Sequence, residues 1–506
     1  MPKSRQKLSR VGNPFTCDDS ELINIATKAV FAEDVAADVD RVETLGAELY
    51  SSFRKDRIES GSLNLWAPIK RNKLKLCSTS RKKLKIETNG SVSELNADRS
   101  LFARLLILTR SQRQVDLADI LGKYELSTVP RSMFAYDGTM HLRSSKSSLL
   151  TILKTLGEST GSDAQLIAQV IDLPLTSHCV AVVDGMAELQ AMDKHAEIKT
   201  CADLGKVFTM KMMNKYQHYD EVHIVFDTYR AESIKNLTRS KRSIGEIAAE
   251  YKITDSTDLR TVSMKKLLSH IRTKDALTAY LAHQLVSHAK KTCKSYVVAW
   301  RTEAAASHRS VDSLSSTQEE ADTKLILHAL DAAKRGATKL SIFAQDTDVL
   351  VLAVRRYPEL PSESFFMPGN RDPVSLRHIY TALGALKAAA LPGFHAFSGC
   401  DSTGSLFKKG KLTYWKIFNS SDDKTLHAFA SLGTFDAVSD DVASVLESFV
   451  CRIYHKETQF TTLAALRWWM FSTKQAVGEK LPPTQGAFLP ALRRVNFQAM
   501  VWAKDN

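Results

Sequence analysis

The sequence contains no apolar run long enough to cross a membrane. Spanning a bilayer as a helix takes about 20 consecutive apolar residues, and none of the 506 residues belongs to such a run. The first residues, Met1 to Gly12, are basic and have no apolar core, so we expect no secretory signal peptide. These absences predict a protein of the nucleus or the cytoplasm.

Cysteine is scarce and poorly placed for crosslinking or zinc binding. The seven cysteines are far apart, odd in number, and never form a CxxC pair. This pattern argues against a disulfide framework and against a zinc ribbon. We therefore expect reduced thiols with mostly structural roles.

Acidic residues are outnumbered by basic ones, which gives a formal net charge of +13. A basic surplus of this size favours polyanionic partners, and nucleic acid first. One segment between residues 70 and 85 is basic without an intervening acid, and it is consistent with a solvated loop, a nuclear-import signal or a phosphate-contacting patch. The import reading favours the nucleus over the cytoplasm. The basic residues of this segment are Lys70, Arg71, Lys73, Lys75, Arg81, Lys82, Lys83 and Lys85.

The length is enough for two or three domains. Residues 1–170 mix helical patterns, including one over Ile23 to Phe53, with polar breaks, and their function is not indicated. Residues 171–418 alternate short apolar strands with helical segments, which predicts an α/β domain with a parallel sheet. A polar, basic and mostly helical stretch, about 228–294, reads as an insertion between strands. Residues 419–506 are helical and aromatic.

Acidic residues stand where the expected strands end. The first strand run, which opens at His178, ends in Asp184 and Gly185, and Asp227 closes the run from Glu221 to Asp227. In open α/β sheets, sites form outside the carboxyl ends of the strands. Five more acids stand after later strands or where helices begin: Glu320, Asp322, Asp346, Asp348 and Asp401.

Any one of these acids could be a turn former or a helix N-cap, but seven together point to metal binding. Converging carboxylates repel one another unless cations neutralise them. Oxygen ligands without nearby His or Cys favour Mg²⁺ or Mn²⁺ over zinc. Two such ions, about 3.5 to 4 Å apart, can stabilise the attacking and leaving oxygens of a phosphodiester.

These residues resemble the flap endonuclease and XPG-type structure-specific nucleases of the PIN-like superfamily. Val180 to Asp184 is similar to the family's first strand with its metal-binding Asp. Ile224 to Asp227 is similar to its VFDG motif, with Thr228 in place of the glycine. The ExE, DxD and GCD motifs of the family are matched, in order, by Glu320-Ala321-Asp322, Asp346-Thr347-Asp348 and Gly399-Cys400-Asp401. The layout also resembles multi-copy, mobile-element-derived animal proteins with a PIN-like core.

The resemblance implies a PIN-like sheet and further phosphate-binding residues. The family's helical arch supplies a Lys and an Arg to the scissile phosphate, and these correspond to Lys235 and Arg242, with Arg239 as the rival for the second role. The segment Gly404 to Lys411 resembles the family's duplex-gripping helix-turn-helix. Its expected nucleic-acid contacts are Lys408, Lys409 and Lys411.

We therefore expect a divalent-metal-dependent nuclease that acts by a two-metal mechanism, with DNA favoured over RNA. The alternative is a catalytically silent nucleic-acid-binding protein that keeps the fold. A third class, an assembly protein working through residues 1–170, remains open. Metal-dependent cleavage separates the first from the other two, and salt-sensitive binding separates those from each other.

Overall fold

In the computed structural model the chain forms two compact units, Met1–Gln112 and Arg113–Asn506. The described residues are 33–69, 85–88, 91–94, 116–127, 129–135, 138–141, 147–159, 177–192, 197–229, 250–318, 320–369, 371–473 and 478–504.

The first unit contains short helices and one hairpin. The helix expected over Ile23 to Phe53 is confirmed from residue 33 onward, with a break at Arg41. Helix α3 buries none of its residues, and Tyr50 is 69% exposed. The elements are α2 (Glu33–Asp40), α3 (Val42–Arg54), the π-helical η1 (Lys55–Glu59), and the antiparallel strands β1 (Lys85–Thr88) and β2 (Ser91–Glu94).

The second unit is built around a seven-stranded sheet with the order β6-β5-β4-β3-β7-β8-β9. The strands from β5 to β8 in this order are parallel, and the two edge strands are antiparallel to their neighbours. The strands are β3 (Cys179–Asp184), β4 (Glu221–Val225), β5 (Ser295–Trp300), β6 (Glu303–Ala306), β7 (Lys339–Phe343), β8 (Glu363–Met367) and β9 (Val374–Ser375). The expected α/β class with a mostly parallel sheet is confirmed.

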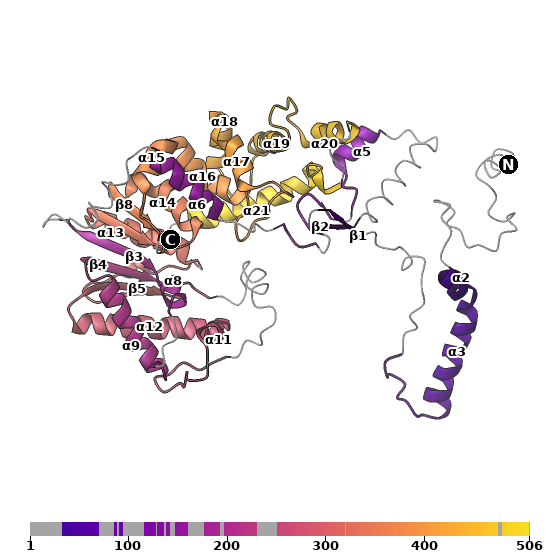
Figure 1. Ribbon diagram of the computed structural model, residues 1–506, viewed down its shortest axis with the longest axis horizontal. Helices are drawn as coiled ribbons and strands as arrows, with labels where there is room; N and C mark the ends of the chain where they lie inside the picture. Colours follow the sequence, from indigo (N-terminus) through magenta and orange to yellow (C-terminus); the bar gives the residue numbers. More distant parts are fainter. Residues whose placement is uncertain are drawn as a thin grey trace. The chain divides into compact units, whose positions relative to one another are not determined.

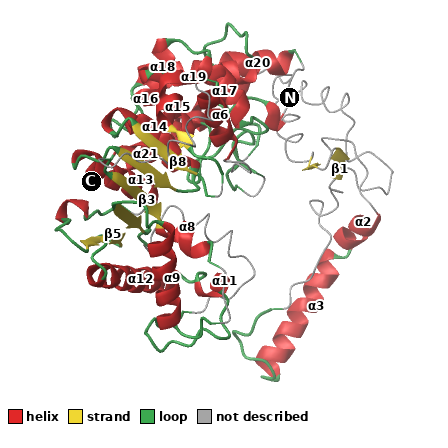
Figure 2. Cartoon of the chain, turned by 60° about the vertical axis from the view of Figure 1, so that its left-hand side comes forward, coloured by secondary structure: helices red, strands yellow, loops and turns green. Residues whose placement is uncertain are grey.

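Helices cover both faces of this sheet (Figures 1 and 2). One face packs against α8 (Gly185–Gln190), α9 (Cys201–Lys215), α11 (Met264–Leu267) and α12 (Ile271–Lys291). The other packs against α6 (Ser147–Glu158), α13 (Ala321–Lys334), α14 (Thr347–Arg356), α15 (Leu376–Leu383) and α16 (Ala385–Phe397).

Strand β3 shows why the strand runs are apolar throughout. Val180 and Val182 belong to the core on one face, and Ala181 and Val183 to the core on the other. All four are fully buried. Successive side chains of a strand point to opposite faces, so a strand covered on both sides needs apolar residues at every position.

Further helices extend the core beyond α16. Gly393 lets α16 and α18 approach closely, because a Cβ atom at this position would lie 2.2 Å from the carbonyl oxygen of Phe429. These helices are α5 (Leu117–Lys123), α17 (Lys411–Asn419), α18 (Asp423–Ala430), α19 (Asp440–Tyr454), α20 (Leu463–Ser472) and α21 (Gln485–Ala503). Short 3₁₀ turns are η2 (Asp312–Leu314), η3 (Tyr357–Glu359) and η4 (Gly478–Lys480).

The division of the chain differs from the boundaries expected at residues 170 and 418. Helices α5 and α6 precede residue 170 but pack against α20 and α15 within the second unit. Residues after 418 share one core cluster with the sheet. Helix α12 falls within the expected insertion, yet it packs on β5 and α9 and forms part of the layer over the sheet.

Among the described residues, no helix is both long enough and apolar enough to cross a bilayer.

A polar cluster lies buried within this fold. His223 of β4 is fully buried, its Nε2 lies 2.9 Å from Glu221, and its Nδ1 lies 2.9 Å from Nδ1 of His328. Arg309 donates to Glu221 at 3.0 Å and to Asp331 at 2.6 Å. Burial alone would raise the pKa of Glu221, but His223 and Arg309 outweigh it and hold that pKa at about 2.

Acid sensitivity of folding is expected from His328. Burial, and then the nearby side chains of His223, Lys324 and Arg309, hold the pKa of His328 well below its usual value. The unfolded chain therefore takes up a proton below about pH 6.5 that the folded chain does not, and stability falls as the pH falls. Lowering the pH from 7 to 5.5 should reduce the free energy of unfolding by about 1 kcal/mol through this site.

The measurement is urea unfolding of the wild type and His328→Leu across that pH range. The variant should lose less stability on acidification than the wild type. Replacing the exposed His218 by Leu should leave the pH dependence unchanged. An unchanged slope in His328→Leu would show that the proton is taken up elsewhere.

Candidate metal centre

Three neighbouring strands end together at one edge of the sheet. Val183 of β3 pairs with Ile224 of β4 on one side and with Phe343 of β7 on the other. The chain order runs outward in opposite directions from β3, first to β4 and β5, later to β7 and β8. Such a switch in direction leaves a crevice at the carboxyl ends of the strands, where α/β proteins place their sites.

Asp184 lies at this edge, at the end of β3. Its carboxylate caps α8 by accepting hydrogen bonds from the backbone nitrogens of Met186 at 2.9 Å and Ala187 at 3.1 Å. Burial, followed by the negative charges of Asp227 and Asp346, raises the pKa of Asp184 to about 7. Three acids from three strand ends therefore act on one another electrostatically, and a cation would relieve their repulsion.

Asp227, just after β4, fixes the start of α13. Its Oδ1 accepts a hydrogen bond from the backbone nitrogen of Ala321 at 2.9 Å. Glu320 is the residue before that helix, and Asp322 lies in its first turn. Asp227 thus brings the beginning of α13, with its two acids, to the edge of the sheet.

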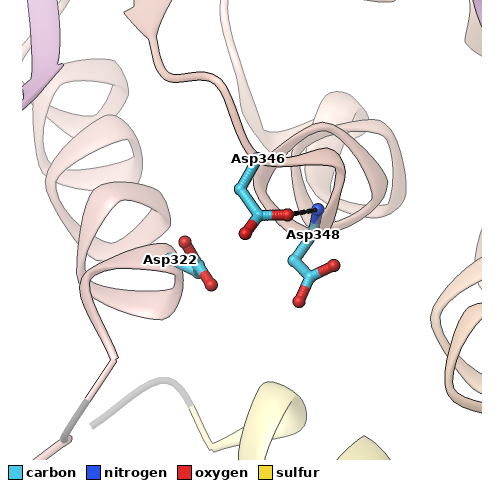
Figure 3. Close-up of side chains that lie close together, drawn as sticks. All are labelled: Asp322, Asp346 and Asp348. Carbon is cyan, nitrogen blue, oxygen red and sulfur yellow. Dashed lines mark hydrogen bonds between the residues drawn. The ribbon is translucent and has the colours of Figure 1, made fainter. Parts of the chain in front are cut away.

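Asp322, Asp346 and Asp348 come closest together (Figure 3). One carboxylate oxygen from each lies within 4.8 Å of the other two. Asp346 caps α14 and accepts a hydrogen bond from the backbone nitrogen of Asp348 at 3.1 Å. Within the described part of the chain, this is the group of acids placed closely enough to share a metal ion.

Two buried residues support Asp348: His395 contacts its carboxylate, and Lys411 contacts His395. Nε2 of His395 lies 2.7 Å from Oδ1 of Asp348, and Nδ1 of His395 lies 2.8 Å from Nζ of Lys411. All three residues are at most 2% exposed. An ammonium group can only donate, so Nδ1 accepts, and the proton of a neutral His395 sits on Nε2 and is donated to Asp348. The ring of Trp502 in α21 stacks on His395 with centroids 5.6 Å apart.

The donor set suits a hard divalent cation. Its ligand atoms are carboxylate oxygens, which Mg²⁺ and Mn²⁺ prefer. A hydrogen bond that orients a ligating carboxylate, as His395 provides here, is a common second layer of metal sites. The residues present therefore fit the expected ions, and the crevice could hold a cation beside a substrate phosphate.

The structure separates the expected metal ligands into three groups. Asp322, Asp346 and Asp348 are brought together, and the negative charges of Asp227 and Asp346 act on Asp184. Glu320 stands half-buried at the start of α13. Asp401 instead lines a cavity between α16, α19 and α21, outside the group of three.

The residues expected to contact phosphate are only partly covered by the described part of the chain. Lys235, Arg239 and Arg242 lie outside the described residues. Lys408 is exposed, and Lys409 lies over the ring of Tyr454 at 4.5 Å. Lys411 is buried and donates to His395 and Ser398, so it is not available to a duplex on the surface, which corrects the prediction for this residue.

His395 and Lys411 are the contributions to the site that the sequence did not reveal. One signal was present: His395 is a lone polar residue near the end of an otherwise apolar helix, Ala388 to Phe397. Lys411 gave no such signal, since it stands among other lysines.

Comparisons with known proteins identify no relative. No family model matches the chain, no curated protein matches its sequence, and no solved structure matches its fold. The chemistry of the carboxylates themselves is therefore the basis for a functional proposal.

Proposed function

We propose that the protein is a divalent-metal-dependent nuclease that hydrolyses phosphodiester bonds, with structured DNA favoured over RNA. The observation that supports this most is the convergence of Asp322, Asp346 and Asp348 at the carboxyl edge of a parallel sheet. Asp184 and Asp227 add negative charge at the same edge. The net charge of +13 suits a polyanionic substrate and contrasts with the acidity of the site.

In this proposal two Mg²⁺ or Mn²⁺ ions would be held by the group of three together with Asp184, Asp227 and Glu320. Bound ions of this kind activate water and neutralise charge on a phosphate. The chain's own residues orient the ligands: Asp227 positions the start of α13, and His395 fixes one oxygen of Asp348. Lys235, with Arg242 or Arg239, is proposed to contact the scissile phosphate. A nuclear location is also proposed for the protein.

The test is cleavage of labelled flap, nicked, hairpin and single-stranded DNA and RNA by the full-length protein. Each substrate is incubated with Mg²⁺, with Mn²⁺ or with EDTA. We expect cutting with either ion, none in EDTA, and a preference for structured DNA. Binding of these substrates without cutting under any metal condition would favour a silent nucleic-acid-binding protein instead.

A further inference from the structure

The second unit contains a large cavity away from the group of three acids. Its volume is about 690 Å³, within the range of about 300 to 1,000 Å³ typical of small-molecule sites. Five described parts of the chain line it: residues 130–134 with 138–140, the end of α16 with the following loop, α17, α19, and α21. A backbone bridge between Phe134 and Met140 shapes the first of these parts.

Apolar and aromatic side chains form most of the lining. Phe134, Phe397, Tyr414 and Phe488 come from four different parts of the chain, and Met140 adds a polarizable side chain. Of these, Phe397, Tyr414 and Phe488 are each less than 10% exposed, so this wall belongs to the packed core. Aromatic walls offer stacking surfaces to a flat ring, and every nucleobase has such a ring.

Among the described residues that line the same cavity, two are charged, Arg494 and Asp401. Nε of Arg494 donates to the carbonyl oxygen of Ser402 at 2.6 Å, which anchors the side chain. Its two terminal nitrogens have no hydrogen-bond partner among the described residues. A guanidinium held in this way presents a planar fork that matches a phosphate or a carboxylate.

We propose that this cavity binds a nucleoside monophosphate. The guanidinium of Arg494 binds the phosphate, and the aromatic side chains stack on the base. The carboxylate of Asp401 accepts a hydrogen bond from a sugar hydroxyl or a base amino group. A single phosphate is matched because Arg494 is the one cationic residue of the described lining. A second or third phosphate would place more negative charge beside Asp401, and the described lining has no further cationic residue to pair with it.

A fatty acid is the main competing ligand, since its carboxylate could also pair with Arg494. Its apolar chain, however, makes no use of Asp401, and that carboxylate would repel the acid head group. A nucleotide carries donors from which the carboxylate of Asp401 can accept, so it can contact both charged residues of the described lining. This proposal goes beyond the nuclease function and does not require it, because binding here involves no metal.

The experiment is isothermal titration calorimetry of the full-length protein in EDTA. AMP, GMP, CMP and UMP are the probes, with inorganic phosphate and laurate for comparison. Three variants are measured: Arg494→Leu removes the fork, Ala491→Phe fills the cavity, and Arg493→Leu removes an exposed neighbouring arginine as a control. Circular dichroism and thermal unfolding check that each variant is folded.

We expect at least one monophosphate to bind the wild type and Arg493→Leu alike. Loss of a charge-assisted hydrogen bond should weaken that binding by roughly 10- to 100-fold in Arg494→Leu, and Ala491→Phe should abolish it. The proposal is overturned if no monophosphate binds, if Arg494→Leu binds as tightly as the wild type, if phosphate alone binds as tightly, or if laurate binds in place of nucleotides. Since EDTA removes the metal, a failed nuclease test leaves this result standing.

Discussion

Replacing Asp346 and Asp348 together by Asn should reduce metal-dependent cleavage by at least about a thousandfold. A metal ion contributes several kcal/mol of transition-state stabilisation, and about 4 kcal/mol corresponds to a factor of a thousand. Asn keeps the shape of both side chains and can still cap α14, so the protein should remain folded. The measurement is single-turnover cleavage of the preferred substrate with saturating Mn²⁺.

A second pair of acids provides the control for this double variant. Asp440 and Asp441 occupy the first turn of α19 and are exposed. Replacing both by Asn removes the same charge from another helix start and should leave cleavage unchanged. If the Asp346 and Asp348 variant cuts as fast as the wild type while folded, the acids at this sheet edge do not perform the reaction.

Replacing Arg467 by Leu should lower the free energy of unfolding by about 3 to 5 kcal/mol, the cost of breaking a buried ion pair from one side. Arg467 of α20 is 2% exposed. It donates to the carbonyl oxygen of Leu121 at 2.7 Å, to that of Pro482, and to the carboxylate of Glu125 at 3.2 Å. Leucine would remove this donor from the carbonyl oxygens of Leu121 and Pro482, and the carboxylate of Glu125 would lose its ion-pair partner.

Urea unfolding followed by tryptophan fluorescence measures this effect as a lower midpoint. Arg467→Lys should fall between wild type and Arg467→Leu, because Lys keeps the charge but lacks the fork that reaches several acceptors. Arg493→Leu, on the surface, should change the midpoint little. A midpoint for Arg467→Leu equal to that of the wild type would mean that water replaces the hydrogen bonds that the Arg467 side chain had donated.

The strands and most acids of the site could be predicted because their signals are local. A strand buried on both faces needs an uninterrupted apolar run, as in Val180 to Val183, and an acid directly after it lies at the carboxyl edge. Asp346 and Asp348 follow β7 in this way, whereas Asp322 joins them because Asp227 holds the start of α13 at the same edge. The PIN-like identity, the two ions and the nuclease activity stay predictions.

Other features depend on contacts between residues far apart in the sequence, and no local sequence pattern indicates them. Lys411 stands in a run of lysines that reads as a surface turn, but its partner His395 lies 16 residues earlier, and the carboxylate behind that histidine belongs to Asp348. Likewise, α5 belongs with the second unit because Gly122 packs against Ala464. Charge and periodicity alone do not show which distant side chain completes such a contact.

The edges of the sheet bear on how the second unit could recognise a partner. The five parallel strands are all interior, and the sheet ends in β6, of four residues, and β9, of two. Short edge strands offer few unpaired backbone groups to another chain. Recognition by addition of a partner's strand to the sheet is therefore disfavoured. An assembly involving this unit would have to use its helices and loops, and the sheet itself would be protected from edge-to-edge aggregation.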